Sequence, residues 1–318
     1  MVVHNQKPKM YSKVLVPLDG SKLAEGVLPH VTTLIRDRDS QVHLLSVAPT
    51  TRGAKWPLVD LHRGAEEQQR VKRELEKYLQ AVAKRLEPVA ASVQTSVRFG
   101  RPADEILAFA GDVGADLIAT STHGRSGISR WVFGSVADRL LRGATCPILL
   151  VRAGQAQSQT TYQRILAPLD GSELAEQILP YIKALIRPNH TRVFLVSILT
   201  TGLGERTVTL LTSYPPGLQL ATTALHHAEI QMRTYLRSVA AVLREQGAVV
   251  NVAVRQGSPT EEILDYADEI EADLIGMTTH GLSGPSRWVY GNVAGQVLQG
   301  SQSPVLLVRP TGVGSDSR

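Results

Sequence analysis

The sequence LVPLDGS at residues 15–21 recurs as LAPLDGS at residues 166–172, 151 positions later. In both places an apolar run ends in Asp-Gly-Ser, which predicts a strand followed directly by the amino-terminal cap of a helix. Two further blocks, THG at 122–124 and SRWV at 129–132, recur 157 positions later. A period of this length is much longer than a solenoid repeat, so the chain is predicted to be a duplicated domain.

The two copies are predicted to occupy residues 10–153 and 162–310 and to form a pseudo-symmetric pair. Residues 153–161 between them consist only of Ala, Gly, Gln, Ser and Thr, a composition typical of a flexible linker. The larger offset of the later blocks places six extra residues in the second copy. We expect them within residues 200–220, because glycines and prolines at that density predict a loop.

Strand and helix patterns alternate along each copy. In such a chain the strands form a parallel sheet with helices on both faces. The predicted fold class is therefore α/β, with two tandem, doubly wound, parallel five-stranded sheets, which bind ligands at the carboxyl ends of their strands. The first copy has predicted strands at 14–18, 42–47, 93–97, 117–120 and 148–151, and helices at 22–35, 71–86, 103–111 and 134–141. The second copy has predicted strands at 165–169, 193–198, 250–254, 274–277 and 305–308, and helices at 232–243, 260–267 and 291–298.

The last predicted strand is continuously apolar in both copies, ILLV at 148–151 and VLLV at 305–308. A bare edge strand of this composition invites aggregation. We therefore expect the fifth strands to be paired, either copy to copy within one chain or chain to chain as a homodimer. The alternative is that each fifth strand lies centrally within its own sheet.

Composition and charge exclude several classes of protein. Apolar residues make up 43% of the 318, enough for two cores, and no run of about 18 apolar residues predicts a membrane span. The net charge of +5 is not gathered in a Lys/Arg block, whereas nucleic-acid-binding proteins usually carry a clustered basic face. Neither a membrane nor a nucleic acid is expected as a partner. A single cysteine, Cys146, expected to be a buried structural thiol, and a short polar amino terminus predict a cytoplasmic protein.

A loop of small residues follows the fourth predicted strand. Residues 121–127 read STHGRSG, and Gly134-Ser135 then opens a helix. Glycines let backbone amides approach a phosphate, and a helix amino terminus offers unpaired N–H groups. Asp19, at the tip of the first strand, is placed to bond ribose hydroxyls, and Val47, at the end of the second, to offer a base an apolar wall. The alternative is that the loop only turns the chain and that Asp19, like Asp170, is a plain turn or cap residue.

With these motifs the chain resembles a tandem member of the universal stress protein family over residues 10–153 and 162–310. ATP-binding members carry the pattern Gly-x2-Gly-x9-Gly-Ser/Thr between the fourth strand and the fourth helix. The sequences HGRSG at 123–127 and PILLV at 147–151 are also typical of the family. At the four pattern positions the first copy has Ser121, Gly124, Gly134 and Ser135, and the second copy has Thr278, Gly281, Gly291 and Asn292.

The resemblance implies the strand order 3-2-1-4-5, dimerisation through the fifth strands, and ATP with Mg²⁺ as the cofactor. The resemblance places nucleotide contacts at the ends of the first, second and fourth strands and at the start of the fourth helix. Neighbouring residues of the strand ends and the loop are added as candidates. In the first copy the candidate cofactor-binding residues are Pro17, Leu18, Asp19, Val47, Ser121, Gly124, Arg125, Gly127, Gly134, Ser135 and Val136. In the second copy they are Pro168, Leu169, Asp170, Ile198, Thr278, Gly281, Gly284, Gly291, Asn292 and Val293.

The function indicated is that of a regulatory ATP-binding protein of the stress response with at most slow hydrolysis. No catalytic or metal-binding residue is assigned, because there is no P-loop, no dinucleotide-binding Gly-x-Gly-x-x-Gly after the first strand, no Gly-x-Ser-x-Gly elbow and no Cys/His cluster. Two alternatives stay open. One is a nucleotide-free dimerisation or interaction module, which the departures at Ser121 and Asn292 favour. The other is an ATP-hydrolysing enzyme, for which only fold analogy argues.

Overall fold

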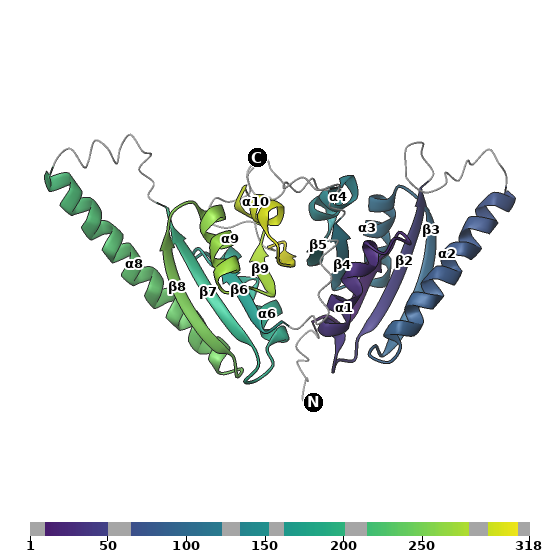
Figure 1. The fold of residues 1–318 in the computed structure, drawn as a ribbon, viewed down its shortest axis with the longest axis horizontal. Coiled ribbons are helices and arrows are strands. Elements are labelled where there is room, and N and C mark those ends of the chain that lie inside the picture. Colours follow the sequence, from purple (N-terminus) through teal and green to yellow (C-terminus); the bar gives the residue numbers. More distant parts are fainter. Residues whose placement is uncertain are drawn as a thin grey trace, which may run out of the picture. The chain divides into compact units, whose positions relative to one another are not determined.

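The apolar segments of the first copy form five strands of one parallel sheet, shown in Figure 1. The middle strand of the five is β1, in which residues 14–17 are all buried. The strands are β1 (Lys13–Pro17), β2 (Gln41–Pro49), β3 (Ser92–Gly100), β4 (Leu117–Thr122) and β5 (Ile148–Arg152), in the order β3-β2-β1-β4-β5. This order is the 3-2-1-4-5 that the family resemblance implies, so the predicted fold class is confirmed.

The computed structural model describes residues 10–49, 65–122, 134–152, 162–200, 215–279 and 292–310. Contacts divide the chain into two compact units, Met1–Thr161 and Tyr162–Arg318. The strands of the second unit are β6 (Arg164–Pro168), β7 (Arg192–Leu199), β8 (Val249–Gln256), β9 (Leu274–Thr278) and β10 (Val305–Val308), in the order β8-β7-β6-β9-β10. Within its own unit each fifth strand is last in this order, so the alternative of a central fifth strand is wrong. Pairing of the fifth strands stays a prediction.

The first helix of the first unit is shorter than the sequence predicts. A 3-10 turn, η1 (Ala24–Val27), precedes α1 (Leu28–Ile35). Ser21 caps the turn, since its Oγ accepts a hydrogen bond from the Ala24 N–H at 3.0 Å. Pro29 explains the break, because proline lacks an N–H and is tolerated only in a first helical turn. The other helices are α2 (Ala65–Leu86), α3 (Pro102–Val113) and α4 (Ser135–Gly143).

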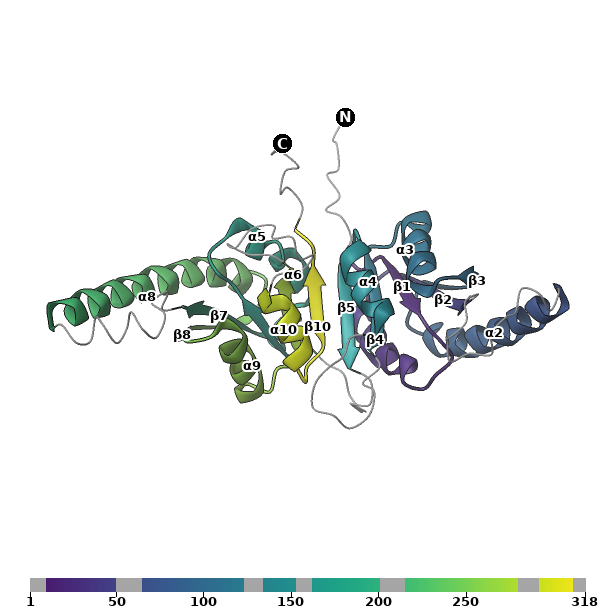
Figure 2. The same ribbon diagram turned by 90° about the horizontal axis from the view of Figure 1, so that it is seen from above.

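Helices cover both faces of the sheet, as Figure 2 shows for each unit. Successive side chains along a strand point to opposite faces. On one face of β2, Ala48 packs in a cluster with Val71 and Leu75 of α2. On the other face, the His43 ring meets Phe109 of α3 edge-on, with ring centroids 6.1 Å apart. The first unit therefore has two core layers, one on each side of its sheet.

In the second unit the long helix begins earlier than predicted. Residues 200–220 are predicted to form a loop, but α8 (Pro215–Arg244) begins at Pro215, so that prediction is wrong for residues 215–220. A helix starts readily at a proline, because the first-turn N–H that proline lacks would have no partner there. Within the described ranges no helix is long and apolar enough to cross a membrane. The other helices are α5 (Glu173–Glu176), α6 (Leu179–Leu185), α9 (Pro259–Glu269) and α10 (Asn292–Gly300).

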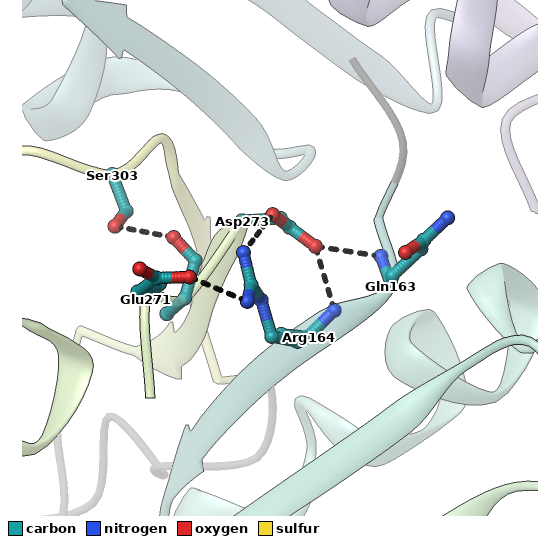
Figure 3. Close-up of polar contacts among 6 residues, drawn as sticks. Gln163, Arg164, Glu271, Asp273 and Ser303 are labelled. Atoms are coloured by element: carbon teal, nitrogen blue, oxygen red, sulfur yellow. Dashed lines mark hydrogen bonds and ion pairs between the residues drawn. The ribbon is translucent and has the colours of Figure 1, made fainter. Parts of the chain in front are cut away.

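An aspartate ties the start of β6 to the start of β9, as Figure 3 shows. Asp273 Oδ2 accepts hydrogen bonds from the N–H groups of Gln163 and Arg164 at 2.8 and 2.7 Å. The Arg164 guanidinium lies 3.8 Å from Asp273 Oδ1 and donates to Glu271 at 2.7 Å. In the first unit Asp116 has the same role, because it accepts from the backbone at residues 12 and 13. The amino ends of the strands are therefore fastened by acidic side chains.

Asp273→Asn is expected to lower the free energy of unfolding of the second unit by about 1–2 kcal/mol, because the amide keeps one acceptor oxygen but loses the charge on these bonds. Calorimetry of the full chain measures this as a lower transition temperature for one unit. Asp116→Asn is the matched control and should lower the transition of the other unit. If Asp273→Asn left the transition temperature of the second unit unchanged, the role of Asp273 in fastening the strands would be contradicted.

Candidate functional site

A short acidic turn, residues 19–25, follows β1. The Asp19 carboxylate accepts a hydrogen bond from the Ser21 N–H at 2.9 Å, and Gly20 has a φ of 80°, in the left-handed region that favours glycine. Asp19 is thus a turn residue, as one interpretation of the sequence has it. A carboxylate has about four acceptor positions on its two oxygens, so the turn bond and a ligand contact are compatible.

The second unit has the equivalent acidic turn, residues 170–176. The Ser172 N–H and hydroxyl both donate to Asp170 Oδ1, at 3.0 and 2.6 Å. The Ser172 Oγ accepts in turn from the Ala175 N–H at 3.1 Å and so caps α5. Both copies therefore hold the candidate carboxylate by a bond from the backbone N–H of the serine two positions later.

The first acidic turn lies where the winding of the sheet reverses. β1 has β2 on one side and β4 on the other, and in such sheets the crevice at the carboxyl ends of these strands is the usual ligand site. The Leu18 N–H donates to the Leu45 carbonyl at 2.8 Å. From β4, the Ser121 hydroxyl donates to the Leu23 carbonyl at 2.8 Å. Ser121, at the first glycine position of the family pattern, thus ties the acidic turn to β4.

A small pocket opens beside Asp19. It brings together three candidate residues, Leu18, Asp19 and Val47, with apolar side chains of α2 that the sequence analysis does not single out as site residues. Its volume is about 10 Å³, close to that of one water, so a base would lie at its mouth or displace side chains of α2. The lining residues are Leu18, Asp19, Ser46, Val47, Ala48, Pro49, Val71 and Leu75.

The amino terminus of α4 lies at the other candidate residues of the first unit. Gly134, in extended conformation, precedes Ser135, and no side chain among the described residues caps the helix. Gly134 and Ser135 are exposed, and Val136 is half-buried. Asp138 in the first turn would repel an anion, but Arg142 donates two hydrogen bonds to it, at 2.9 and 3.2 Å. The first-turn N–H groups keep their preference for an anion.

The remaining candidates divide between strand ends and undescribed positions. Pro17, Pro168 and Leu169 lie at or just beyond the ends of β1 and β6, Ile198 lies on β7 in register with Arg255, and Thr278 ends β9. Asn292 and Val293 open α10. Gly124, Arg125, Gly127, Gly281, Gly284 and Gly291 lie outside the described residues.

Two side chains of α2 that the sequence does not reveal as site residues reach the acidic turn. The Tyr78 hydroxyl donates to Glu25 Oε1 at 3.3 Å, and the Arg85 guanidinium pairs with the other oxygen of Glu25. Burial, together with the nearby carboxylates of Glu25 and Asp19, raises the pKa of Tyr78, so its hydroxyl remains a donor. Tyr78 belongs to the apolar face of its helix by spacing, and only the fold shows its polar contact.

Neither a metal centre nor a reactive thiol is evident in the part of the chain that the structure describes. No group of three or more His, Cys, Asp and Glu side chains there could hold a metal ion. Burial raises the pKa of the Cys146 thiol to about 11, so the thiol is protonated at neutral pH. The Cys146 side chain is half-buried, less than the buried thiol that the sequence predicts.

The fold and the site define the class of protein. It is a tandem α/β protein with two doubly wound domains, each of which has an acidic turn at the carboxyl ends of its strands, where the winding reverses. The Universal stress protein family matches residues 10–152 and 161–309. The chain therefore belongs to the universal stress protein family and is a tandem member of it.

Relatives of known name match about one unit each. A universal stress protein of Methanocaldococcus jannaschii is 32% identical over 149 residues, which is 45% of this chain and 83% of the relative. Universal stress protein YxiE of Bacillus subtilis is 30% identical over 148 residues, 45% of this chain and 100% of the relative. A solved universal stress protein of Archaeoglobus fulgidus matches the fold of both units, with a TM-score of 0.67 and 20% identity over 97% of this chain and 98% of that one.

Proposed function

We propose that the chain is an ATP-binding regulatory protein of the stress response and that its principal site lies at the carboxyl edge of the first sheet. The observation that carries this proposal is the pocket that Asp19 shares with Val47 at the carboxyl ends of β1 and β2, beside α2. Asp19 would accept from the ribose hydroxyls, and Val47 would contact the base at the pocket mouth. The loop containing Gly124 and the amino terminus of α4 would bind the phosphates.

Several contacts must act together for useful affinity. A helix terminus contributes about 0.3–1 kcal/mol per charge contact, whereas micromolar binding requires about −8 kcal/mol. Ribose, base and phosphate contacts are therefore all needed. Mg²⁺ would be coordinated mainly by phosphate oxygens and water, because a protein usually supplies only one or two carboxylates to this ion.

The second unit would hold a weaker site. It keeps Asp170 in the same turn as Asp19, and its Thr278 is buried at the end of β9. Asn292 replaces the family's Ser/Thr at the start of the fourth helix. Asparagine still favours a helix amino terminus, but its larger side chain leaves less room for a phosphate.

A nucleotide-free interaction module is the second candidate function. Ser121 favours it, because a hydroxymethyl group stands where ATP-binding relatives have glycine and is bonded to the Leu23 carbonyl. In that case the fifth strands, which we expect to pair, would carry the function. In both cases we place the protein in the cytosol, and no described group is proposed as a general base.

Mass analysis of small molecules released from the denatured, purified protein separates the two functions. The proposed function predicts an adenine nucleotide, or, if it is lost in purification, saturable binding of added ATP with Mg²⁺. Neither release nor binding of a nucleotide would favour the interaction module. A turnover assay with Mg²⁺-ATP is expected to show at most slow hydrolysis, and rapid turnover would instead make the protein an enzyme.

A further inference from the structure

The first acidic turn is anchored to the helix that walls the pocket. Glu25, at its end, receives both the Tyr78 hydroxyl and the Arg85 guanidinium of α2. Val71 and Leu75 of the same helix line the pocket with Asp19. Since β4 holds the turn through Ser121, the position of Asp19 relative to the pocket is set from both sides.

The second unit keeps the tyrosine and the glutamate of this anchor but differs from the first in two respects. Tyr235 of α8 occupies the place of Tyr78, and burial, with the nearby carboxylates of Glu176 and Asp170, raises its pKa. Its hydroxyl is buried but makes no hydrogen bond of standard geometry within the described residues. Where the first unit has Arg85, the second has Val242, whose side chain is exposed. The ionic half of the anchor is therefore absent from the described residues of the second unit.

We propose that Tyr78 is a positioning residue of the first nucleotide site: through Glu25 it fixes the acidic turn, and with it the carboxylate that receives the ribose. This inference rests on the proposed function. Tyr78 and Arg85 both bond the first turn, and the described residues show no equivalent bonds at the second turn. The first site therefore recognises ribose hydroxyls more strongly than the second.

Ribose selectivity is the property that tests this role. In a chain whose second site is silenced by Gly281→Val, the counterpart of Gly124→Val, calorimetric titration compares ATP with 2′,3′-dideoxy-ATP, which lacks both ribose hydroxyls. Tyr78→Phe removes one hydroxyl and is expected to weaken ATP binding about 3- to 10-fold, the size of one or two hydrogen bonds, and to leave dideoxy-ATP affinity unchanged. A purely structural defect would weaken both nucleotides alike.

Three further variants sharpen the comparison. Arg85→Val, which installs the residue of the second unit, should give a loss of the same kind but smaller. Lys84→Ala, at an exposed neighbouring position, should change neither affinity. With the first site silenced by Gly124→Val, Val242→Arg should strengthen ATP binding at the second.

Two results would overturn the inference and differ in what they leave standing. If Tyr78→Phe leaves the ratio of ATP to dideoxy-ATP affinity unchanged while the wild type binds ATP, the positioning role is wrong and the nucleotide site stands. If the wild-type chain binds neither nucleotide, the proposed function fails together with the inference.

Discussion

Acidification from pH 7 to pH 4 is expected to destabilise the first unit much more than the second. Among its described residues the first unit buries two histidines, His30 of α1 and His43 of β2, which are 3% and 5% exposed. Burial lowers the pKa of His30 from 6.5 to about 4. Burial, helped by the charge of Lys13, also lowers the pKa of His43. At the matching positions the second unit has Tyr181 and Phe194, which do not titrate in this range.

Protonation of the two histidines opposes folding. A histidine with a folded pKa below its unfolded value contributes its full stability above pH 6.5 and loses it as the pH falls from there toward about 4, the folded value for His30. For His30 the shift corresponds to about 3 kcal/mol, a large part of the stability of an ordinary domain. His43 adds to this, because both its ring nitrogens are buried without a hydrogen bond in the described part of the chain.

Calorimetry of the full chain between pH 7 and pH 4 measures the effect. The two unfolding transitions should move apart in temperature as the pH falls. The variant His43→Phe shows which transition belongs to the first unit. The temperature of that transition should rise at every pH and should depend less on pH. Phenylalanine fits there because Phe194 makes the equivalent edge-on contact with Tyr266 in the second unit, at 6.2 Å. Transitions that fall in parallel, unaffected by His43→Phe, would show that these histidines do not govern acid stability.

Gly124→Val is expected to reduce ATP affinity at the first site by at least about 100-fold, or about 2.7 kcal/mol, which is the loss of several phosphate contacts. Gly124 is the second glycine of the family pattern, and a branched side chain there would occupy the space that a phosphate needs next to backbone amides. Titration with ATP, in a chain whose second site is silenced by Gly281→Val, measures the loss.

The control for Gly124→Val is the same substitution at Gly111 on α3. Gly111 is exposed, and an added Cβ there would meet no atom within 4 Å, so ATP affinity should not change. Circular dichroism should show both variants folded. ATP affinity retained in folded Gly124→Val would contradict phosphate binding by this loop.

The sheet could be predicted from the sequence because each strand is a short apolar run and the runs alternate with helical patterns. The errors have local causes. Pro29 starts α1 after a 3-10 turn where a continuous helix is predicted. Pro215 opens α8 inside a stretch whose composition is typical of a loop. Proline both breaks and begins helices, and the sequence does not distinguish the two at these places.

The candidate site was predictable only where a residue ends a strand. Asp19 and Val47 follow from the strand ends, and the structure places them in one pocket. The Tyr78–Glu25 hydrogen bond joins residues 53 positions apart, and no local pattern marks it. Ser121 is recognisable as a departure from the family pattern, but its bond to the Leu23 carbonyl depends on how β4 and the acidic turn meet.

Hydrogen exchange of the full chain with and without Mg²⁺-ATP tests most directly whether a nucleotide lies at the carboxyl edge of the sheet. The predicted result is ATP-dependent protection of peptides covering residues 18–26 and 134–138, with weaker protection of residues 169–177. Exchange in all of these peptides that is unaffected by saturating ATP would contradict a nucleotide site at this edge.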